Sequence, residues 1–269
     1  MISLKPHAMR ALVSFFIILL LSGLATAHET QQESASGSPL RNRTVVLVHG
    51  FFADAGCWSD VIRILQKIGV RVVAVENPLA SLAGDAEATR RVIDAQQGQV
   101  VLVGHSWGGA VITQAGVNPK VSSLVFVAAF APDQGMSVEN LISGFPPAPW
   151  TATLQRDDSG NLSLSEAGYM TYFAPDLPAH QARVLAAEQG ATFGETLLQP
   201  VSQAAWHVKP SWYVLAENDQ MIPPELQRAM SSRMKARVVP VRSSHVVMLS
   251  HPEAVAAVIL EAVLARPND

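Results

Sequence analysis

The sequence is poor in cysteine and in charged residues. Cys57 is the single cysteine of the 269 residues, so no disulfide can form within the chain. A lone cysteine with no base beside it in the sequence is more often a small buried hydrophobic residue than a nucleophile, and we expect no catalytic role for it. Asp, Glu, Lys and Arg make up 15% of the chain, the net charge is −3, and no basic stripe is present. We therefore expect no nucleic-acid partner.

A long hydrophobic run is also missing. The apolar segment 11–24 is shorter than the roughly 20 residues that a membrane-spanning helix needs. It follows a short basic region and precedes Ala25-Thr26-Ala27, which fits the small-residue rule for signal-peptidase cleavage. Residues 1–27 are therefore predicted to be a signal peptide, and the polar residues 28–43 a flexible leader. The mature protein is expected to be exported, to the periplasm or the medium, without a membrane partner.

The most informative stretch is QVVLVGHSWGGAVITQAG, residues 99–116. Its first part, Val100–Val103, is a short run rich in β-branched residues, which is typical of a strand buried on both faces of a parallel sheet. The pattern Gly104-His105-Ser106-Trp107-Gly108 follows, and residues with helical spacing come next. In a strand-to-helix elbow of this kind, small neighbours let strand and helix approach while the serine hydroxyl stays exposed. Ser106 is therefore the expected nucleophile.

Short apolar runs alternate with amphipathic segments along the rest of the chain. Strands are expected at 44–48, 70–75, 121–130, 211–216 and 237–241, and helices at 58–68, 81–97, 224–234 and 252–265. The repeated β-α units predict an α/β fold with a mostly parallel, doubly wound sheet of about six strands, in one domain over residues 44–269. Prolines break this rhythm over about residues 131–209, where we expect a cap of short helices over the strand ends.

A serine nucleophile needs a neighbouring base, and the base needs an acid that fixes its tautomer. His245 follows the strand expected at 237–241, and Asp219 follows the strand expected at 211–216. Because the carboxyl ends of parallel strands share one edge of a sheet, Ser106, Asp219 and His245 are the expected catalytic residues. Asp133, after the strand expected at 121–130, is a second candidate for the acid. Asp219 is favoured because the prolines that follow it restrict its loop.

Acyl transfer also needs hydrogen-bond donors for the developing oxyanion. The backbone N–H of Trp107, directly after the nucleophile, is one expected donor, and that of Phe51, in the loop after the first strand, is the other. His105 is expected to point away from Ser106 and to have a structural role. Aromatic side chains of the loop after the first strand and of the cap are expected to line a substrate pocket: Phe52, Trp150, Tyr169, Phe173 and Trp206.

With these motifs the chain resembles the α/β-hydrolase-fold serine esterases, in particular the small subgroup similar to plant methylesterases and hydroxynitrile lyases. The stretches that carry the resemblance are TVVLVHGFFADAGCW (44–58), RVVAVENPLASL (71–82), VLVGHSWGGAVITQAG (101–116), ENDQMIPPELQ (217–227) and SSHVVMLSHPEAVA (243–256). The resemblance implies Ser106, Asp219 and His245 as the triad, with Phe51 and Trp107 as oxyanion donors. The two antiparallel strands that usually lead this fold are expected to be absent, because the first strand comes so soon after the predicted signal peptide.

The resemblance leaves more than one activity open, because one triad supports several reactions. The leading hypothesis is hydrolysis of carboxylic esters of small or medium hydrophobic or aryl substrates through an acyl-enzyme, with neither metal nor cofactor. Cyanohydrin cleavage would, by the resemblance, require a lysine near the triad, and the lysines after the elbow are Lys120, Lys209 and Lys235. The third alternative is a ligand-binding receptor that keeps the triad and turns over slowly.

Overall fold

The computed structural model describes residues 42–265. The predicted signal peptide and nearly all of the predicted leader lie outside the described residues, as do residues 266–269. All of the described residues fall within one structural unit. Searching residues 42–265 gives no helix that is both long and apolar enough to span a membrane.

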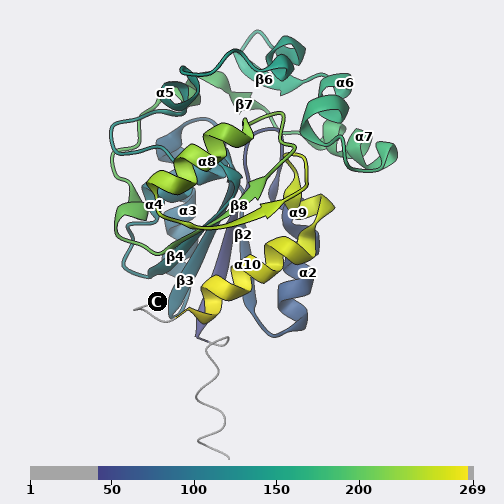
Figure 1. Cartoon of the computed structure of the whole chain (residues 1–269). Coiled ribbons are helices and arrows are strands. Elements are labelled where there is room, and N and C mark those ends of the chain that lie inside the picture. Colours follow the sequence, from purple (N-terminus) through teal and green to yellow (C-terminus); the bar gives the residue numbers. More distant parts are fainter. Residues whose placement is uncertain (1–41, 266–269) are drawn as a thin grey trace, which may run out of the picture. The chain divides into compact units, whose positions relative to one another are not determined.

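The core of the described chain is a six-stranded sheet in the order β2-β1-β3-β4-β8-β9 (Figure 1). Its strands are β1 Arg43–Val48, β2 Arg71–Val75, β3 Gln99–Ser106, β4 Val121–Ala129, β8 Ser211–Ala216 and β9 Arg237–Val241. All neighbouring strands in it are parallel. The central strands are buried almost throughout, which explains why they are continuous apolar runs in the sequence. The prediction of a mostly parallel sheet of about six strands is confirmed, and within residues 42–265 no strand precedes β1.

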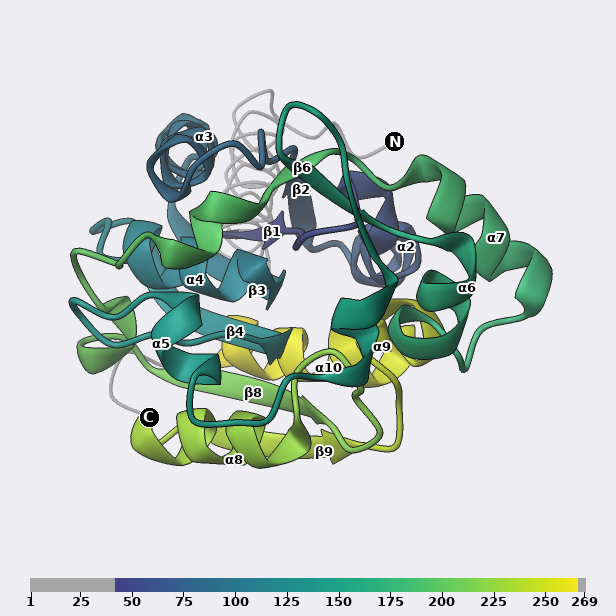
Figure 2. The same cartoon turned by 90° about the horizontal axis from the view of Figure 1, so that it is seen from above.

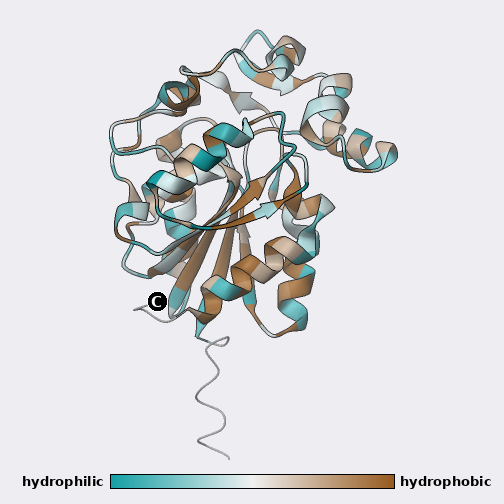
Figure 3. Cartoon of the chain, in the orientation of Figure 1, coloured by the Kyte–Doolittle hydropathy of each residue, from teal (hydrophilic) through white to brown (hydrophobic). Residues whose placement is uncertain are grey.

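Helices cover both faces of this sheet, as Figure 2 shows from above. On one face lie α2 Ser59–Lys67 and α10 Pro252–Leu264, with η1 Ala55–Trp58 and α9 Val247–Ser250 before them. On the other face lie α3 Leu82–Ala95, α4 Trp107–Ala115 and α8 Pro224–Arg233. The hydrophobic residues gather on the strands and the inner helix faces, and hydrophilic residues lie on outer surfaces such as that of α8 (Figure 3). The doubly wound architecture is thereby confirmed.

The segment between β4 and β8 forms a cap above the carboxyl ends of the strands (Figure 1). Its helical elements are α5 Val138–Ile142, η2 Pro149–Thr153, α6 Glu166–Gly168, the π-helical turn η3 Tyr169–Phe173, α7 Ala179–Glu188, η4 Gly194–Leu198 and η5 Ala205–His207. The cap also contains a three-stranded antiparallel sheet of β5 Leu154–Arg156, β6 Asn161–Leu164 and β7 Thr192–Phe193. The expectation of short helices is therefore incomplete, because these strands are too short to produce a recognisable alternation in the sequence.

The parallel arrangement brings four candidate site residues to the same edge of the sheet. Ser106 is the last residue of β3, and the loops after β1, β8 and β9 carry Phe51, Asp219 and His245, respectively. The cap lies above this edge of the sheet (Figure 2). This is the edge at which ligands bind in open α/β sheets.

Candidate active site

Ser106 lies at the junction of β3 and α4, in a backbone conformation that residues other than glycine seldom adopt. Its φ is 53° and its ψ is −121°, a strained conformation that persists only when the surrounding structure imposes it. The packing of α4 against the end of β1 supplies this constraint, because a Cβ on Gly108 would collide with the carbonyl oxygen of Val48. The strand-to-helix elbow expected from the sequence is present, and Ser106 is 7% exposed at its tip.

The loop after β1 lies directly against this elbow. A Cβ added to Gly50 would be 2.6 Å from the Cβ of Ser106 and 3.1 Å from the backbone nitrogen of Trp107. His49 fixes the loop: its Nδ1–H donates to the carbonyl oxygen of Gly50 at 2.9 Å, and its Nε2 accepts from the backbone N–H of Asn77 at 2.9 Å. Only glycine at position 50 allows so close an approach of the two loops.

Phe51 and Trp107, the two expected oxyanion donors, are neighbours in space. Their rings stack with centroids 4.9 Å apart and planes at 28°. The indole Nε1–H of Trp107 donates to Asp85 Oδ2 at 2.7 Å, and Asp85 Oδ1 accepts the backbone N–H of Leu79 at 2.8 Å. Burial raises the pKa of Asp85, and these two hydrogen bonds lower it in part. A buried carboxyl group therefore holds the side chain of the residue that follows the nucleophile.

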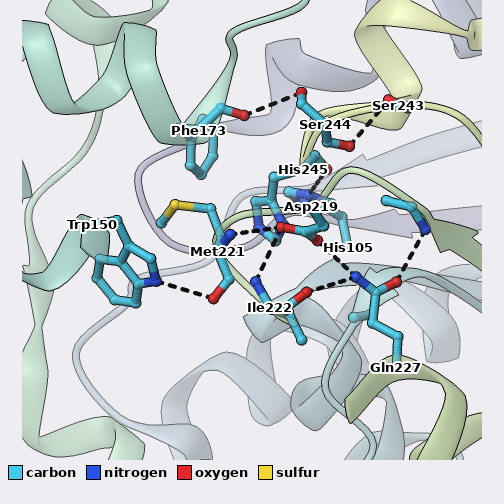
Figure 4. A network of polar contacts seen from close by, with 12 residues as sticks. His105, Trp150, Phe173, Asp219, Met221, Ile222, Gln227, Ser243, Ser244 and His245 are labelled. Atoms are coloured by element: carbon cyan, nitrogen blue, oxygen red, sulfur yellow. Dashed lines mark hydrogen bonds and ion pairs between the residues drawn. The ribbon is translucent and has the colours of Figure 1, made fainter. Parts of the chain in front are cut away.

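His245 and Asp219 form a buried hydrogen-bonded pair (Figure 4). The distance from His245 Nδ1 to Asp219 Oδ2 is 2.8 Å, and the two side chains are 1% and 0% exposed. The same Oδ2 accepts from Gln227 Nε2 at 2.8 Å, and Oδ1 accepts the backbone N–H groups of Met221 at 2.7 Å and Ile222 at 3.0 Å. The carboxylate, which faces donors only, makes Nδ1 of His245 the protonated nitrogen and leaves Nε2 as an acceptor.

Asp133, the other candidate for the acid, contacts a different histidine. Its Oδ1 is 2.7 Å from Nε2 of His207 and accepts the backbone N–H of Gln134 at 2.7 Å. Slight burial raises the pKa of Asp133, but the hydrogen bonds from His207 and Gln134 outweigh it and hold the pKa below its ordinary value. Of the two candidate acids, Asp219 is the one that the structure places against His245.

His105 lies next to His245 and supports its backbone. Its ring is fully buried, and its Nε2–H donates to the carbonyl oxygen of His245 at 3.0 Å, with the two ring centroids 4.6 Å apart. Burial, with a smaller contribution from His245, lowers the pKa of His105 well below its ordinary value, so the ring is neutral. The contact matches the structural role expected for this histidine.

Ser106 and His245 both line an apolar cavity of about 530 Å³ beneath the cap. Among the described residues, no hydrogen bond connects the Ser106 hydroxyl to the imidazole; such contacts are often long without substrate and shorten when it binds. Three of the five aromatic residues expected in the pocket line this cavity, namely Phe52, Trp150 and Phe173. The remaining walls are largely aliphatic and aromatic, and include Val138, Ile142, Phe145, Leu197, Met221 and Leu226.

Tyr169 and Trp206, the other two aromatic residues expected in the pocket, are not among the described residues that line this cavity. Tyr169 is buried behind Phe173, with ring centroids 4.5 Å apart, and its hydroxyl donates to the carbonyl oxygen of Phe52 at 3.3 Å. Trp206 lies in η5, where its Nε1–H donates to the carbonyl oxygen of Pro132 at 3.0 Å. The sequence identifies the aromatic residues of the cap, but it does not show which of their rings face the cavity.

Gln227 is a site residue that the sequence reasoning missed. Its amide Nε2 donates to Asp219 Oδ2 and, at 2.9 Å, to the carbonyl oxygen of Ile222, while its Oε1 accepts the backbone N–H of Ala216 at 3.1 Å. The side chain is fully buried. Its position in the first turns of the helix after the Asp219 loop is the signal that could have identified it.

No cluster of His, Cys, Asp and Glu suited to a metal ion is found within residues 42–265.

Comparison with known proteins identifies the family of the chain. A family model described as the alpha/beta hydrolase family matches residues 45–258. Methylesterase 2 of Arabidopsis thaliana is 28% identical over 237 residues, covering 74% of this chain and 87% of that protein. A probable hydrolase, R7, of a Phoma species is 29% identical over 252 residues, covering 81% and 96%, respectively. The crystal structure of a pyrethroid hydrolase from Sphingobium faniae superimposes with a TM-score of 0.73 at 22% identity, covering 84% of this chain and 99% of that one.

Proposed function

The chain belongs to the alpha/beta hydrolase family, and we propose that it is an exported serine esterase that cleaves carboxylic esters through an acyl-enzyme. The observation that carries this proposal is the buried pair of Asp219 and His245 beside the strained Ser106, all at one edge of the sheet. The name of the methylesterase among its relatives supports an ester substrate.

The proposed mechanism follows from the geometry of the three residues. Ser106 Oγ attacks the ester carbonyl carbon while Nε2 of His245 takes its proton, and Asp219 stabilises the imidazolium through Nδ1–H. The backbone N–H groups of Phe51 and Trp107 donate to the carbonyl oxygen as it becomes an oxyanion. His245 then gives its proton to the departing alcohol oxygen, leaving Ser106 acylated. Water, deprotonated by the same histidine, attacks the acyl carbon, and His245 returns this proton to Ser106 Oγ as the bond between Oγ and the acyl carbon breaks and the acid is released.

The walls of the cavity indicate the class of ester. They are apolar almost throughout, and among the described residues that line the cavity Glu139, which is exposed, is the one acidic or basic side chain besides His245. A volume of about 530 Å³ holds a small or medium-sized hydrophobic or aryl ester. Soluble butyrate esters should therefore be cleaved faster than emulsified long-chain triglycerides, and the opposite order would contradict the assignment of the cavity.

No observation favours cyanohydrin cleavage as a second candidate function. Lys120 Nζ donates to the carbonyl oxygens of Asp94 and Gln96, and Lys209 Nζ to that of Val121, all at the opposite edge of the sheet. Lys235 follows α8. None of the three lines the cavity, so the cationic side chain that this reaction would need is missing from its walls. A slow receptor differs from an esterase in rate alone, and sustained turnover at low enzyme concentration distinguishes the two.

The test of the proposed function uses Ser106→Ala with a matched serine control. Wild-type protein should hydrolyse p-nitrophenyl butyrate over many turnovers, and a fluorophosphonate should label Ser106 alone. Ser106→Ala should lose both properties, whereas Ser123→Ala, which changes a buried serine of β4 outside the cavity, should keep them. Equal turnover in Ser106→Ala and wild type would refute the proposal.

The proposed export is tested separately. The secreted protein should have the intact mass of a chain that begins at His28, and retention of residues 1–27 would refute the proposed export.

A further inference from the structure

One carboxylate of the cap, that of Asp176, accepts three hydrogen bonds from the loop that carries His245. Asp176 lies between η3 and α7. Its Oδ2 accepts the backbone N–H of Ser244 at 2.8 Å and the hydroxyl of Ser243 at 3.1 Å, and its Oδ1 accepts the hydroxyl of Ser244 at 2.5 Å. All three donors belong to the two residues that directly precede His245.

The same cap segment also contacts the imidazole. The ring of Phe173 meets the His245 ring at 65° with centroids 5.2 Å apart, and its carbonyl oxygen is 3.4 Å from the hydroxyl of Ser244 (Figure 4). On the other side, His105 donates to the carbonyl oxygen of His245. The backbone of the proposed base is therefore held from the sheet by His105 and from the cap by Asp176.

The environment of Asp176 suits a fixed carboxylate. Burial acts to raise its pKa, but the hydrogen bonds from Ser244, Ser250 and Ser243 together outweigh burial and hold the pKa below its ordinary value. Within residues 42–265, Asp176 forms no ion pair. Hydrogen bonds to a charged group are stronger than those between neutral groups. The contacts that stabilise this carboxylate are thus largely those that fix the loop before His245.

We propose that Asp176 is a positioning residue that sets the orientation of His245 by anchoring Ser243 and Ser244 to the cap. The inference rests on the proposed esterase function, for which His245 is the base. Misplacement of a reacting group by about 1 Å costs on the order of 100-fold in rate. Release of the loop from Asp176 should therefore lower kcat, whereas KM should change little because Asp176 does not line the cavity.

The kinetic test compares Asp176→Ala, Asp176→Asn and Asp157→Ala on p-nitrophenyl butyrate. Asp176→Ala should lower kcat about 10- to 100-fold, with KM within roughly threefold of the wild-type value. Asp176→Asn should restore most of kcat, because its amide oxygen still accepts from Ser244 N–H and its amide N–H can donate to the Ser244 hydroxyl. Asp157 is the matched control: it is a cap aspartate that accepts the backbone N–H groups of Ser159 and Asn161, in the turn between β5 and β6. Asp157→Ala should leave kcat unchanged.

A measurement that needs no turnover separates this inference from the proposed function. The Nδ1 proton of His245, hydrogen-bonded to Asp219, should give a low-field proton NMR signal that is absent in His245→Gln. In Asp176→Ala this signal should broaden through exchange with solvent, and in Asp157→Ala it should persist. If wild type shows no turnover above Ser106→Ala, the proposed function fails, whereas the NMR comparison still tests the positioning.

Two outcomes would overturn the inference. The first is a folded Asp176→Ala variant, by circular dichroism, with kcat within twofold of wild type and an unchanged low-field signal. The second outcome applies if Asp176→Ala does not fold, and it is measured on Ser244→Ala. Ser244→Ala, which removes one hydroxyl contact to Asp176, should then lower kcat several-fold at unchanged KM. Wild-type kcat in that variant would refute the positioning role.

Discussion

Replacement of Asp219 by asparagine changes which ring nitrogen of His245 carries the proton, and it leaves the shape of the site intact. In the wild-type structure Oδ1 accepts two backbone N–H groups, from Met221 and Ile222, and Oδ2 accepts from Gln227 and His245. The asparagine oxygen should keep the Oδ1 position, because an amino group there would face two donors. Its NH₂ group then faces His245, whose Nδ1 must become an acceptor. Nε2 is protonated in that tautomer and cannot take the proton of Ser106.

The size of the effect follows from this change of tautomer. In the serine proteases the same substitution lowers kcat about 10⁴-fold, which corresponds to about 5 kcal/mol of transition-state stabilisation. We expect a loss of that order here, with KM nearly unchanged because Asp219 does not line the cavity. The free energy of unfolding should fall by about 1–3 kcal/mol, since the amide N–H₂ of Gln227 loses one of its two acceptors in a fully buried position.

Asp133→Asn provides the matched control for this measurement. It alters an aspartate–histidine contact of similar length, 2.7 Å to His207, that lies outside the cavity. Its kcat for p-nitrophenyl butyrate should stay within about twofold of wild type, as expected for a change remote from the chemistry. Urea unfolding of each variant establishes that the assays compare folded proteins. The assignment of Asp219 would be refuted if folded Asp219→Asn kept more than a tenth of kcat, or if Asp133→Asn were the inactive variant.

Two further predictions concern the elbow and the cap. Gly50→Ala should lower kcat/KM at least tenfold and stability by about 1–3 kcal/mol, because the added Cβ lies 2.6 Å from that of Ser106; an unchanged melting temperature and rate would refute this close approach. The pKa of Asp176 is lower in the folded than in the unfolded chain. The charged carboxylate therefore stabilises the folded protein at pH values above the ordinary pKa of Asp, and this stabilisation is lost as the pH falls through the pKa of the folded state. The stability difference between wild type and Asp176→Asn should therefore shrink from pH 7 towards pH 3, and a difference that grows would contradict the shift. Burial raises the pKa of Asp85, so this residue has the opposite effect on the pH dependence of stability. Both proteins contain Asp85, and its contribution cancels in this comparison.

The sheet was predictable because its strands are apolar runs bounded by residues that end them. The strands β8 Ser211–Ala216 and β9 Arg237–Val241 have the predicted bounds, and β4 ends one residue before the prediction. The small strands of the cap were not predictable in this way, since β5, β6 and β7 have three, four and two residues. Their one local signal is the turn at Asp157–Gly160, where Gly160 has a φ of +86°.

The residues of the candidate site can be divided in the same way, into those that the sequence predicts and those that only the structure shows. Ser106, Asp219 and His245 could be named from the sequence because each follows a strand, and parallel strands bring their carboxyl ends together. Asp85 and Asp176 could not, because their partners are set by how helices and cap pack. The contact between Asp176 and Ser244, for example, joins residues 68 positions apart and depends on the path of the cap. A pattern in the local sequence carries no record of such a contact.

The cap contacts both the cavity and the loops that carry Asp219 and His245. Trp150 lines the cavity, and its Nε1–H donates at 3.0 Å to the carbonyl oxygen of Met221, in the loop that carries Asp219. Phe173 lines the same cavity, and Asp176, three residues later, holds the loop that carries His245. A displacement of Trp150 or Phe173 that widens the cavity should therefore stretch contacts to the loop that carries Asp219 or to the loop that carries His245. Changes in the cap that admit a larger ester should lower kcat for small esters as well as altering KM, because the same segments shape the cavity and orient the catalytic pair.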